Sequence, residues 1–221
     1  MSKKAFLLFC MSFIACNLFA QNYDEETRIT TEYPQFRTAK VVTAVKGDTL
    51  KLLGNIFLKD GSFVYKKGSN VLRANPRTIR EVIFGDTIYH NCDTMMARVI
   101  DTCNNNMLLE SRLIDQTTWV RRAQNSQDVT SLTMRDVIQF TTVESNSYDG
   151  DPFPVMRDYF FLYNDKIVHA SDRVLIKKVP KEKRQQYRAI TQNERFNWRN
   201  IDNLKELLKF LSGVKFDDIK I

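Results

Sequence analysis

Short runs of β-branched and aromatic residues, separated by tight-turn residues, dominate residues 37–114 of this chain. The turns occur at Lys46-Gly47-Asp48, Asp60-Gly61, Lys67-Gly68-Ser69, Gly85-Asp86 and Cys103-Asn104-Asn105-Asn106. Residues of these types tolerate positive φ or bond their own backbone, so each group marks a chain reversal. The runs between them, such as Val82-Ile83-Phe84, are typical of strands. This alternation predicts an antiparallel β-meander.

The turn positions define the expected strands. We expect them at Thr38–Val45, Thr49–Leu58, Ser62–Lys66, Asn70–Ala74, Ile79–Phe84, Thr87–Asn91, Met95–Thr102 and Met107–Ile114. Asn75-Pro76-Arg77 should interrupt the sheet, because proline lacks the N–H that a ladder needs. Residues 116–151 are less regular and suggest one more strand, Met134–Val143.

The C-terminal part of the chain predicts a hairpin and then helices. Asn164-Asp165 is a two-residue turn between expected strands at Asp158–Tyr163 and Lys166–His169. Helices are expected at Asp172–Val179, capped by Ser171, at Lys181–Thr191 after Pro180, and from Ile201 to Gly213, capped by Asn200. The leucines of this last helix recur on one face and require a packing partner. The predicted fold class is α+β: an N-terminal antiparallel β-meander or partly open barrel with a C-terminal hairpin and two to three packed helices.

The first twenty residues resemble a secretory signal peptide. Lys3 and Lys4 precede the apolar stretch Ala5–Ala15, and Leu18-Phe19-Ala20 offers a cleavage site before Gln21. The stretch is too short to span a bilayer, which takes about 20 residues, so we expect no transmembrane span. Alternatively, Phe13-Ile14-Ala15-Cys16 loosely matches a lipobox, in which Cys16 would be lipidated. The predicted organisation is a signal peptide over 1–20, a mobile polar arm over 21–36, a β-sheet domain over 37–150 and a hairpin with packed helices over 151–221.

Removal of the leader would leave two cysteines, Cys92 and Cys103. In an oxidising compartment an even number of cysteines suggests a disulfide. If Met95–Thr102 is one strand, however, the two cysteines lie at its opposite ends, about 20 Å or more apart, which no disulfide bridges. We therefore expect two free thiols.

Several of these stretches resemble a group of small exported proteins of Bacteroides-like bacteria. The similar stretches are Phe63-Val64-Tyr65, Leu72–Ile79, Val82–Tyr89, the tail Asp158–Leu211 with Asn193–Trp198, and the leader ending Leu18-Phe19-Ala20-Gln21. The group has no assigned activity. The resemblance therefore implies a location in the periplasm or cell envelope and a fold, and it transfers no site residue.

The sequence contains no recognisable catalytic, metal or nucleotide motif, so no cofactor and no metal are expected. Asp-Thr recurs at Asp48, Asp86, Asp93 and Asp101, where turn chemistry accounts for it. His90 and His169 are far apart in the sequence, and neither has the surrounding residues of a zinc site. An exported hydrolase with an unrecognised site remains the alternative function.

The charge of the chain is concentrated near its C-terminus. Residues 165–221 hold fourteen Lys and Arg against eight Asp and Glu, whereas residues 21–164 are close to neutral. The candidate binding residues are Lys177, Lys178, Lys181, Lys183, Arg184 and Arg188, among which Glu182 is the one acid. We call these six residues the basic cluster. An anionic surface or an envelope protein suits it better than nucleic acid, because the chain is expected to be exported. The leading hypothesis is a non-enzymatic envelope protein that binds such a partner or surface.

Overall fold

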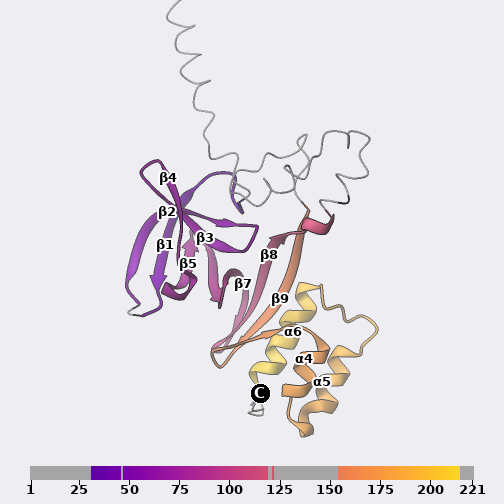
Figure 1. The fold of residues 1–221 in the computed structure, drawn as a ribbon. Coiled ribbons are helices and arrows are strands. Elements are labelled where there is room, and N and C mark those ends of the chain that lie inside the picture. Colours follow the sequence, from indigo (N-terminus) through magenta and orange to yellow (C-terminus); the bar gives the residue numbers. More distant parts are fainter. Residues whose placement is uncertain (1–30, 46, 119–120, 122–153, 215–221) are drawn as a thin grey trace, which may run out of the picture.

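The computed structural model describes residues 31–45, 47–118, 121 and 154–214. Strands come first in this part of the chain and most of the helices follow them (Figure 1). The strands are β1 (Arg37–Thr43), β2 (Thr49–Phe57), β3 (Ser62–Lys67), β4 (Asn70–Arg73), β5 (Ile79–Phe84), β6 (Thr87–Cys92), β7 (Met95–Cys103), β8 (Asn106–Ile114), β9 (Val155–Tyr163) and β10 (Lys166–His169). The helical elements include η2 (Pro76–Thr78), α4 (Asp172–Lys178), η4 (Lys181–Lys183), α5 (Arg184–Thr191) and α6 (Ile201–Ser212).

The strands form one antiparallel sheet in the order β10-β9-β8-β7-β6-β5-β1-β2-β3-β4. The predicted α+β class is therefore confirmed, and the sheet is open rather than closed into a barrel. The predicted C-terminal hairpin, β9–β10, belongs to this same sheet, because β9 pairs with β8 along nearly the whole of both strands. This long pairing also explains why β9 begins at Val155, three residues before the predicted start.

One connection departs from simple neighbour-to-neighbour order. After the edge strand β4 the chain turns through η2 and returns as β5 on the far side of β1. The Asn75 side chain caps η2 by accepting a hydrogen bond from the N–H of Arg77, and Pro76 occupies the first turn. The predicted interruption of the sheet at these residues is confirmed.

The β2–β3 turn reaches across to the middle of the sheet. The N–H of Met96 on β7 donates to the Gly61 carbonyl at 2.8 Å, and the N–H of Ile114 on β8 donates to the Leu58 carbonyl at 2.9 Å. Gly61 has a φ of +72°, and a Cβ at this position would lie 2.7 Å from that of Met95. Only glycine fits both the conformation and the contact. The two hydrogen bonds hold the N-terminal half of the sheet in a curl.

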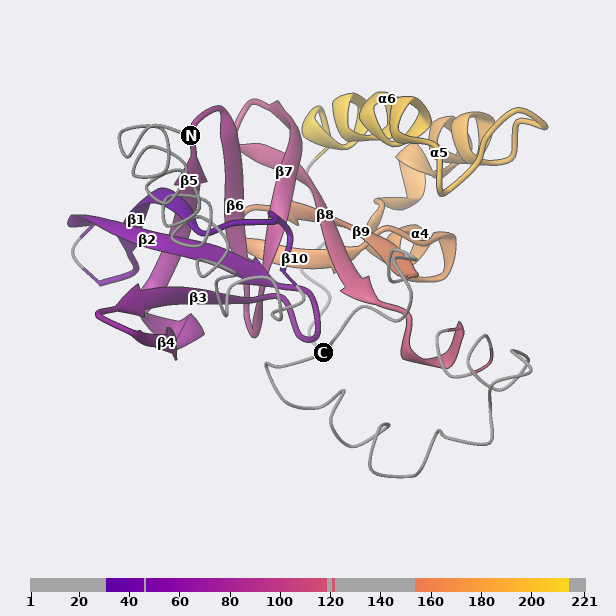
Figure 2. The same cartoon turned by 90° about the horizontal axis from the view of Figure 1, so that it is seen from above.

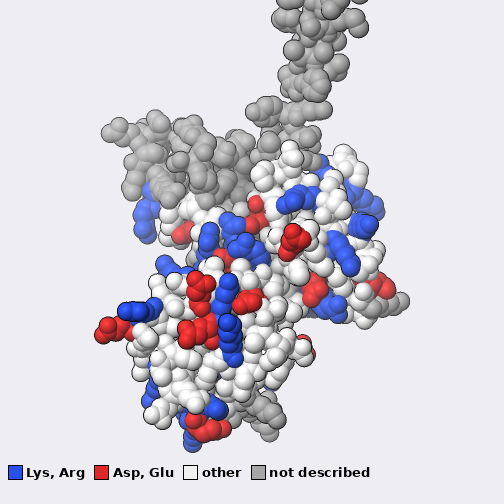
Figure 3. Space-filling model, turned by 180° about the vertical axis from the view of Figure 1, so that it is seen from behind, with Lys and Arg blue, Asp and Glu red and all other residues white. Residues whose placement is uncertain are grey.

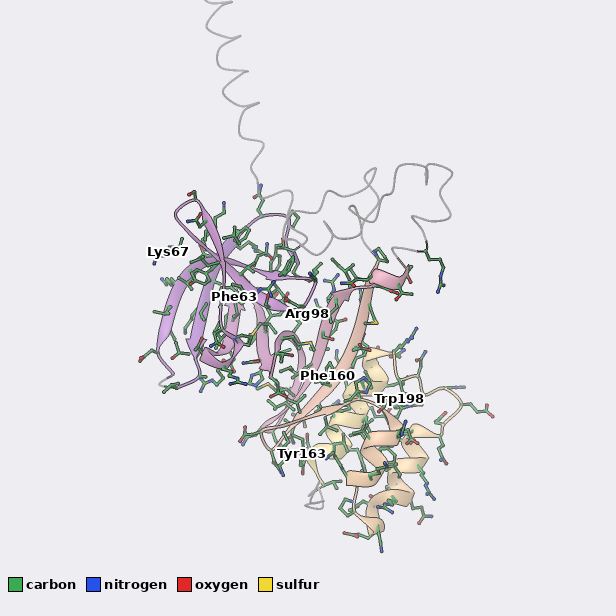
Figure 4. All side chains as sticks on the ribbon, in the orientation of Figure 1. Phe63, Lys67, Arg98, Phe160, Tyr163 and Trp198 are labelled. Atoms are coloured by element: carbon green, nitrogen blue, oxygen red, sulfur yellow. The ribbon has the colours of Figure 1, made fainter. Side chains whose placement is uncertain are left out.

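The buried apolar residues form several clusters, of which two are much larger than the others. The first lies inside the curled half and includes Val41, Ile56, Phe63, Val82 and Phe84 (Figure 4 labels Phe63). The second lies between the strands β8–β10 and the helices, which lie beside the β7–β9 half of the sheet (Figure 2). In α6 the four leucines Leu204, Leu207, Leu208 and Leu211 are buried in this second core. The predicted capping of α6 is confirmed, because the Asn200 side chain accepts hydrogen bonds from the N–H groups of Asp202 and Asn203.

Two local predictions need correction, and the predicted end of α6 at Gly213 is confirmed. Ser171 precedes α4 but makes no side-chain capping hydrogen bond. The helix predicted over Lys181–Thr191 begins as the 3-10 turn η4 and becomes α-helical only at Arg184. Gly213 ends α6 with a φ of −92°, so its ability to adopt positive φ is not used.

Some further predictions are confirmed, and others concern residues outside the described part of the chain. Asn164 and Asp165 both have positive φ, as the two-residue hairpin turn requires. Cys92 and Cys103 are free thiols separated by the length of β7. The predicted signal peptide, Cys16 and the strand predicted at Met134–Val143 lie outside the described residues. No helix in the described part of the chain has the length and apolarity needed to cross a membrane.

Residues 31–36 are fixed to the sheet by the side chain of Asn55. The Asn55 amide group donates to Thr31 Oγ1 and to the carbonyl of Tyr33, and its Oδ1 accepts from the N–H of Tyr33. Asn55 itself is fully buried on β2. The sequence predicts a mobile arm over residues 21–36, but these last six residues are held in place.

The connection between β8 and β9 begins and ends at neighbouring points. The N–H of Asp115, directly after β8, donates to the carbonyl of Pro154, directly before β9, at 2.8 Å. The ladder between the two strands therefore continues for one further step beyond Ile114 and Val155.

Candidate functional site

The basic cluster lies on the helical part of the molecule. Lys177 and Lys178 occupy the last turn of α4, Lys181 and Lys183 belong to η4, and Arg184 and Arg188 belong to α5. Lys177, Lys181 and Arg188 are exposed, and the other three are half-buried. The structure thus brings the six cations together on two short helices and the turn that joins them.

Two members of the basic cluster have structural contacts. The Nε of Arg184 donates to the carbonyl of Val179 at 3.1 Å, which satisfies a backbone acceptor just after α4. Lys183 Nζ lies 3.3 Å from Oε1 of Gln186. In contrast, Lys177, Lys178, Lys181 and Arg188 form no ion pair with any carboxylate that the structure describes. On the face shown in Figure 3, acidic and basic side chains are intermixed over much of the surface.

A second site, which the sequence did not reveal, is a cleft of about 400 Å³ beside the helices. One wall comes from β9 and contributes Arg157, Asp158 and Tyr159. Another comes from the junction between β10 and α4, residues 169–172, and includes His169 and Asp172. The third comes from the loop between α5 and α6, with Trp198 and Arg199. We call it the β9–α4 cleft.

The loop that carries Trp198 is shaped by its asparagines. Asn197 Oδ1 accepts a hydrogen bond from the N–H of Arg199 at 2.8 Å, and the N–H of Asn197 donates to Asn203 on α6. The rings of Phe196 and Trp198 meet edge to face with centroids 5.0 Å apart, and both pack on the second core. Trp198 is therefore held at the cleft beside the helices, where Figure 4 labels it.

The charged side chains that line the cleft differ in whether they have a polar partner. Asp172 Oδ1 accepts a hydrogen bond from the buried hydroxyl of Tyr187 at 2.9 Å, and burial raises the pKa of Tyr187 above its ordinary value. Arg199 has no carboxylate within ion-pair distance among the residues that the structure describes. Because side chains alternate along a strand, Asp158 lies on the opposite face of the sheet from Arg157 and Tyr159.

A group of buried charges lies behind the cleft. Glu110 on β8 is fully buried, and its Oε2 lies 2.5 Å from Nη2 of Arg98 on β7. Its Oε1 lies 3.8 Å from Nη1 of Arg157 and accepts a hydrogen bond from the hydroxyl of Tyr159 at 3.4 Å. Burial, with Glu110 next in importance, raises the pKa of Tyr159. Arg157 is thus tied at one side to a buried carboxylate while about half of its side chain is exposed.

The ion pairs continue along β8 to the N-terminal segment. Arg112, two residues beyond Glu110 and on the same face, pairs with Glu32. Burial outweighs this partner and raises the pKa of the Glu32 carboxyl. A charged residue next to apolar ones, as in Leu108-Leu109-Glu110 or Ala97-Arg98-Val99, was the available sequence signal for this group. The sequence did not show that the charges would face one another.

Cys92, His90 and His169 lack, among the described residues, the contacts that would activate them for catalysis. Burial raises the pKa of the Cys92 thiol to about 12, which leaves it protonated at neutral pH. His90 Nδ1 lies 3.6 Å from Oε1 of Glu81, too far for a hydrogen bond. His169 packs edge to face against Phe160, with ring centroids 5.3 Å apart. In the part of the chain that the structure describes, no three His, Cys, Asp or Glu side chains gather as metal ligands would.

Comparisons with known proteins add no relative to this description. The resemblance to exported proteins of Bacteroides-like bacteria therefore stays a prediction from sequence. Protein-family models, curated proteins and solved structures were each compared with the chain, and none of the three comparisons found a match.

Proposed function

We propose that this chain is an exported protein of the cell envelope that binds an anionic surface through its basic cluster and catalyses no reaction. The observation that carries this proposal is the exposure of Lys177, Lys181 and Arg188 without a carboxylate partner among the described residues. Export rests on the leader sequence, in which Lys3 and Lys4 precede the apolar stretch Ala5–Ala15. The surface would be one that presents phosphate or carboxylate groups.

Stability accounts for only part of this cluster: Arg184 bonds the carbonyl of Val179, and Lys177 and Lys178 lie in the last turn of α4, where cations are mildly favourable. Neighbouring like charges oppose folding slightly, and exposed ion pairs contribute about 0–1 kcal/mol at most. Unpaired cations on one part of the surface do, however, attract an anionic layer at about 1 kcal/mol for each Lys or Arg near it. This attraction should weaken as salt screens it over a Debye length of about 8–10 Å.

The test compares two triple variants with the same net charge. In the first, Lys177, Lys181 and Arg188 are replaced by Gln; Arg184 is kept, because its bond to Val179 supports the fold. In the matched control, the exposed strand residues Lys40, Lys51 and Lys67 are replaced by Gln. Binding is measured by co-sedimentation with phosphatidylglycerol vesicles and with neutral phosphatidylcholine vesicles, at low and high salt.

The proposal expects binding of the parent protein to the anionic vesicles at low salt only. The cluster variant should lose most of this binding and the control variant should keep it, with both melting close to the parent temperature. Equal losses in the two variants would mean that net charge alone is responsible. Binding by the cluster variant equal to that of the parent would show that the cluster is an ordinary solvated surface.

An exported hydrolase is the second candidate, because the β9–α4 cleft brings His169 near Asp172 and Ser171. A general base must lie within hydrogen-bond reach of its partners, and His169 has no hydrogen bond to a carboxylate among the described residues. The test is turnover of chromogenic acyl, phosphoryl and glycosyl esters by the purified chain. Activity that disappears in His169→Ala, while the protein stays folded, would replace the binding proposal with the hydrolase.

A further inference from the structure

The β9–α4 cleft has the features of a small-molecule site that the basic cluster does not provide. Its volume of about 400 Å³ falls within the range of about 300–1,000 Å³ that ligand pockets occupy. Three separate parts of the chain line it, and both aromatic and charged residues are among those that line it. None of the six residues of the basic cluster lines this cleft.

Two guanidinium groups in the cleft are available to an anion. Arg199 is exposed and has no carboxylate partner in the described part of the chain. Nη1 of Arg157 lies 3.8 Å from Oε1 of Glu110, a charge contact longer than a hydrogen bond, and about half of the Arg157 side chain is exposed. Each guanidinium offers five N–H donors in a planar arrangement that matches a carboxylate.

The remaining charge of the cleft limits how much negative charge a ligand can carry. Asp172 also lines the cleft and is hydrogen-bonded through Oδ1 to Tyr187. Asp158 also lines the cleft, but strand alternation places its side chain on the opposite face of the sheet from Arg157. The two arginines and the one carboxylate of Asp172 therefore leave an excess of a single positive charge on this side. A ligand with one negative charge matches that excess, whereas a phosphate dianion would be repelled by Asp172.

The aromatic residues favour a ligand with an apolar body. Trp198 is half-buried and held by its edge-to-face contact with Phe196, and Tyr159 is buried to all but 7% of its surface. An aromatic or branched apolar group placed between them would gain burial and ring contacts. We propose that the β9–α4 cleft binds a small ligand that carries one carboxylate beside an aromatic or apolar group, with Arg157 and Arg199 on the carboxylate and Trp198 on the apolar group.

Trp198 itself can report on binding. The chain has two tryptophans, Trp119 and Trp198, so Trp119→Phe makes Trp198 the sole indole. This protein is titrated with N-acetyl-phenylalanine, with its uncharged amide and with inorganic phosphate, while Trp198 fluorescence is recorded. The inference expects a saturable change with the carboxylate and binding at least about tenfold weaker for the amide and for phosphate.

Two arginine variants separate the site from general charge effects. Arg199→Gln should weaken binding of N-acetyl-phenylalanine about tenfold and leave binding of the amide unchanged. Arg195 is an exposed arginine of the same loop and does not line the cleft. Arg195→Gln should therefore change neither the affinity for N-acetyl-phenylalanine nor the affinity for its amide. Arg199→Lys keeps the charge and should recover part of the loss.

Four outcomes would overturn the inference, of which the first three concern N-acetyl-phenylalanine and the arginine variants. These three are no saturable change with N-acetyl-phenylalanine, equal affinity for the acid and the amide, and equal effects of Arg199→Gln and Arg195→Gln. Tighter binding of phosphate than of the carboxylate would also overturn it, because it would assign the cleft to another ligand class. The vesicle experiment uses other residues, so each of the two proposals can fail while the other stands.

Discussion

The carboxylate of Glu110 lies 2.5 Å from the guanidinium of Arg98, directly opposite it on the neighbouring strand. Solvent does not reach the Glu110 side chain, whereas about a third of the Arg98 side chain is exposed. The pair lies on the face that both cores share, at the middle of the molecule, where Figure 4 labels Arg98. A buried carboxylate here depends on its arginine, because the charge has lost its hydration.

Replacing Arg98 should therefore lower the free energy of unfolding by far more than the loss of an exposed ion pair would. We expect Arg98→Met to lower the free energy of unfolding by about 3–5 kcal/mol, because Glu110 is left buried without its nearest cation. The double variant Arg98→Met/Glu110→Leu should regain most of that loss, since no unpaired charge remains. Urea denaturation of the parent and both variants measures the difference. A cost below about 1 kcal/mol for Arg98→Met would indicate that Glu110 is hydrated.

Glu32 should make stability depend on pH in a defined direction. Burial raises its pKa in the folded protein above the ordinary value of 4.5, so the folded state binds this proton more tightly than the unfolded state. The resulting stabilisation is fully present below pH 4.5 and is lost as pH rises through the raised pKa. Glu32→Gln should remove this loss of stability with rising pH, and the variant should be at least as stable as the parent at neutral pH.

The measurement for Glu32 is urea denaturation at several pH values between acid and neutral. Glu182→Gln, which removes an exposed carboxylate on η4, serves as the control and should leave the pH dependence as it is in the parent. A Glu32→Gln variant that is clearly less stable than the parent at neutral pH would show that the Arg112 pair outweighs burial.

Asn55 should control the attachment of residues 31–36. Asn55→Ala removes a side chain that bonds Thr31 and both backbone groups of Tyr33. Each buried group left without a partner costs about 1–3 kcal/mol, unless the segment detaches and water replaces the bonds. We expect faster amide hydrogen exchange at Glu32 and Tyr33, with exchange in β5 and β6 little changed. Unchanged exchange at Tyr33 would mean that other contacts hold the segment.

The leucine face of α6 should anchor the helices to the sheet. Leu207 is fully buried, and Leu207→Ala should lower the free energy of unfolding by about 2–5 kcal/mol through the cavity that it leaves. Glu206→Ala, at the exposed neighbouring position, is the control and should change it little. Urea denaturation gives both values. A loss of less than about 0.5 kcal/mol in Leu207→Ala would show that the helix does not pack as described.

The N-terminus of the mature protein distinguishes two forms of export. Cleavage after Ala20 would give a chain that begins at Gln21, whereas lipidation would give a chain that begins at acylated Cys16. We expect Gln21, to be identified by mass spectrometry of the protein recovered from envelope fractions. A chain that still begins at Met1 would contradict export.

The elements that the sequence predicts correctly are those whose bounds are set by residues adjacent to them in the chain. The predicted bounds of Ile79–Phe84 and Lys166–His169 agree with β5 and β10, because turn residues of specific types lie at both of their ends. The cap at Asn200 and the leucine spacing of α6 are likewise properties of adjacent residues. Such signals extend over a few residues, and the sequence shows them directly.

Pairings between distant residues could not be read in the same way. The contact of Gly61 with β7 and the opposition of Glu110 to Arg98 depend on sheet curvature and on strand register. The cleft needs β9, the start of α4 and the loop around Trp198 to meet, and no local pattern encodes that meeting. For this reason the basic cluster, which is contiguous in the sequence, was identified, and the cleft was not.

The hydrogen bond between Asp115 and Pro154 makes the β8–β9 connection a natural point for engineering. Because the two ends of residues 116–153 already meet, the strand register on either side does not depend on the length of chain between them. The entropy of closing a loop grows only as about 1.5 RT ln n, so a much shorter or longer connection changes it little. A reporter domain, an affinity tag or a new chain terminus could be placed there while the pairing of β8 with β9 keeps its register.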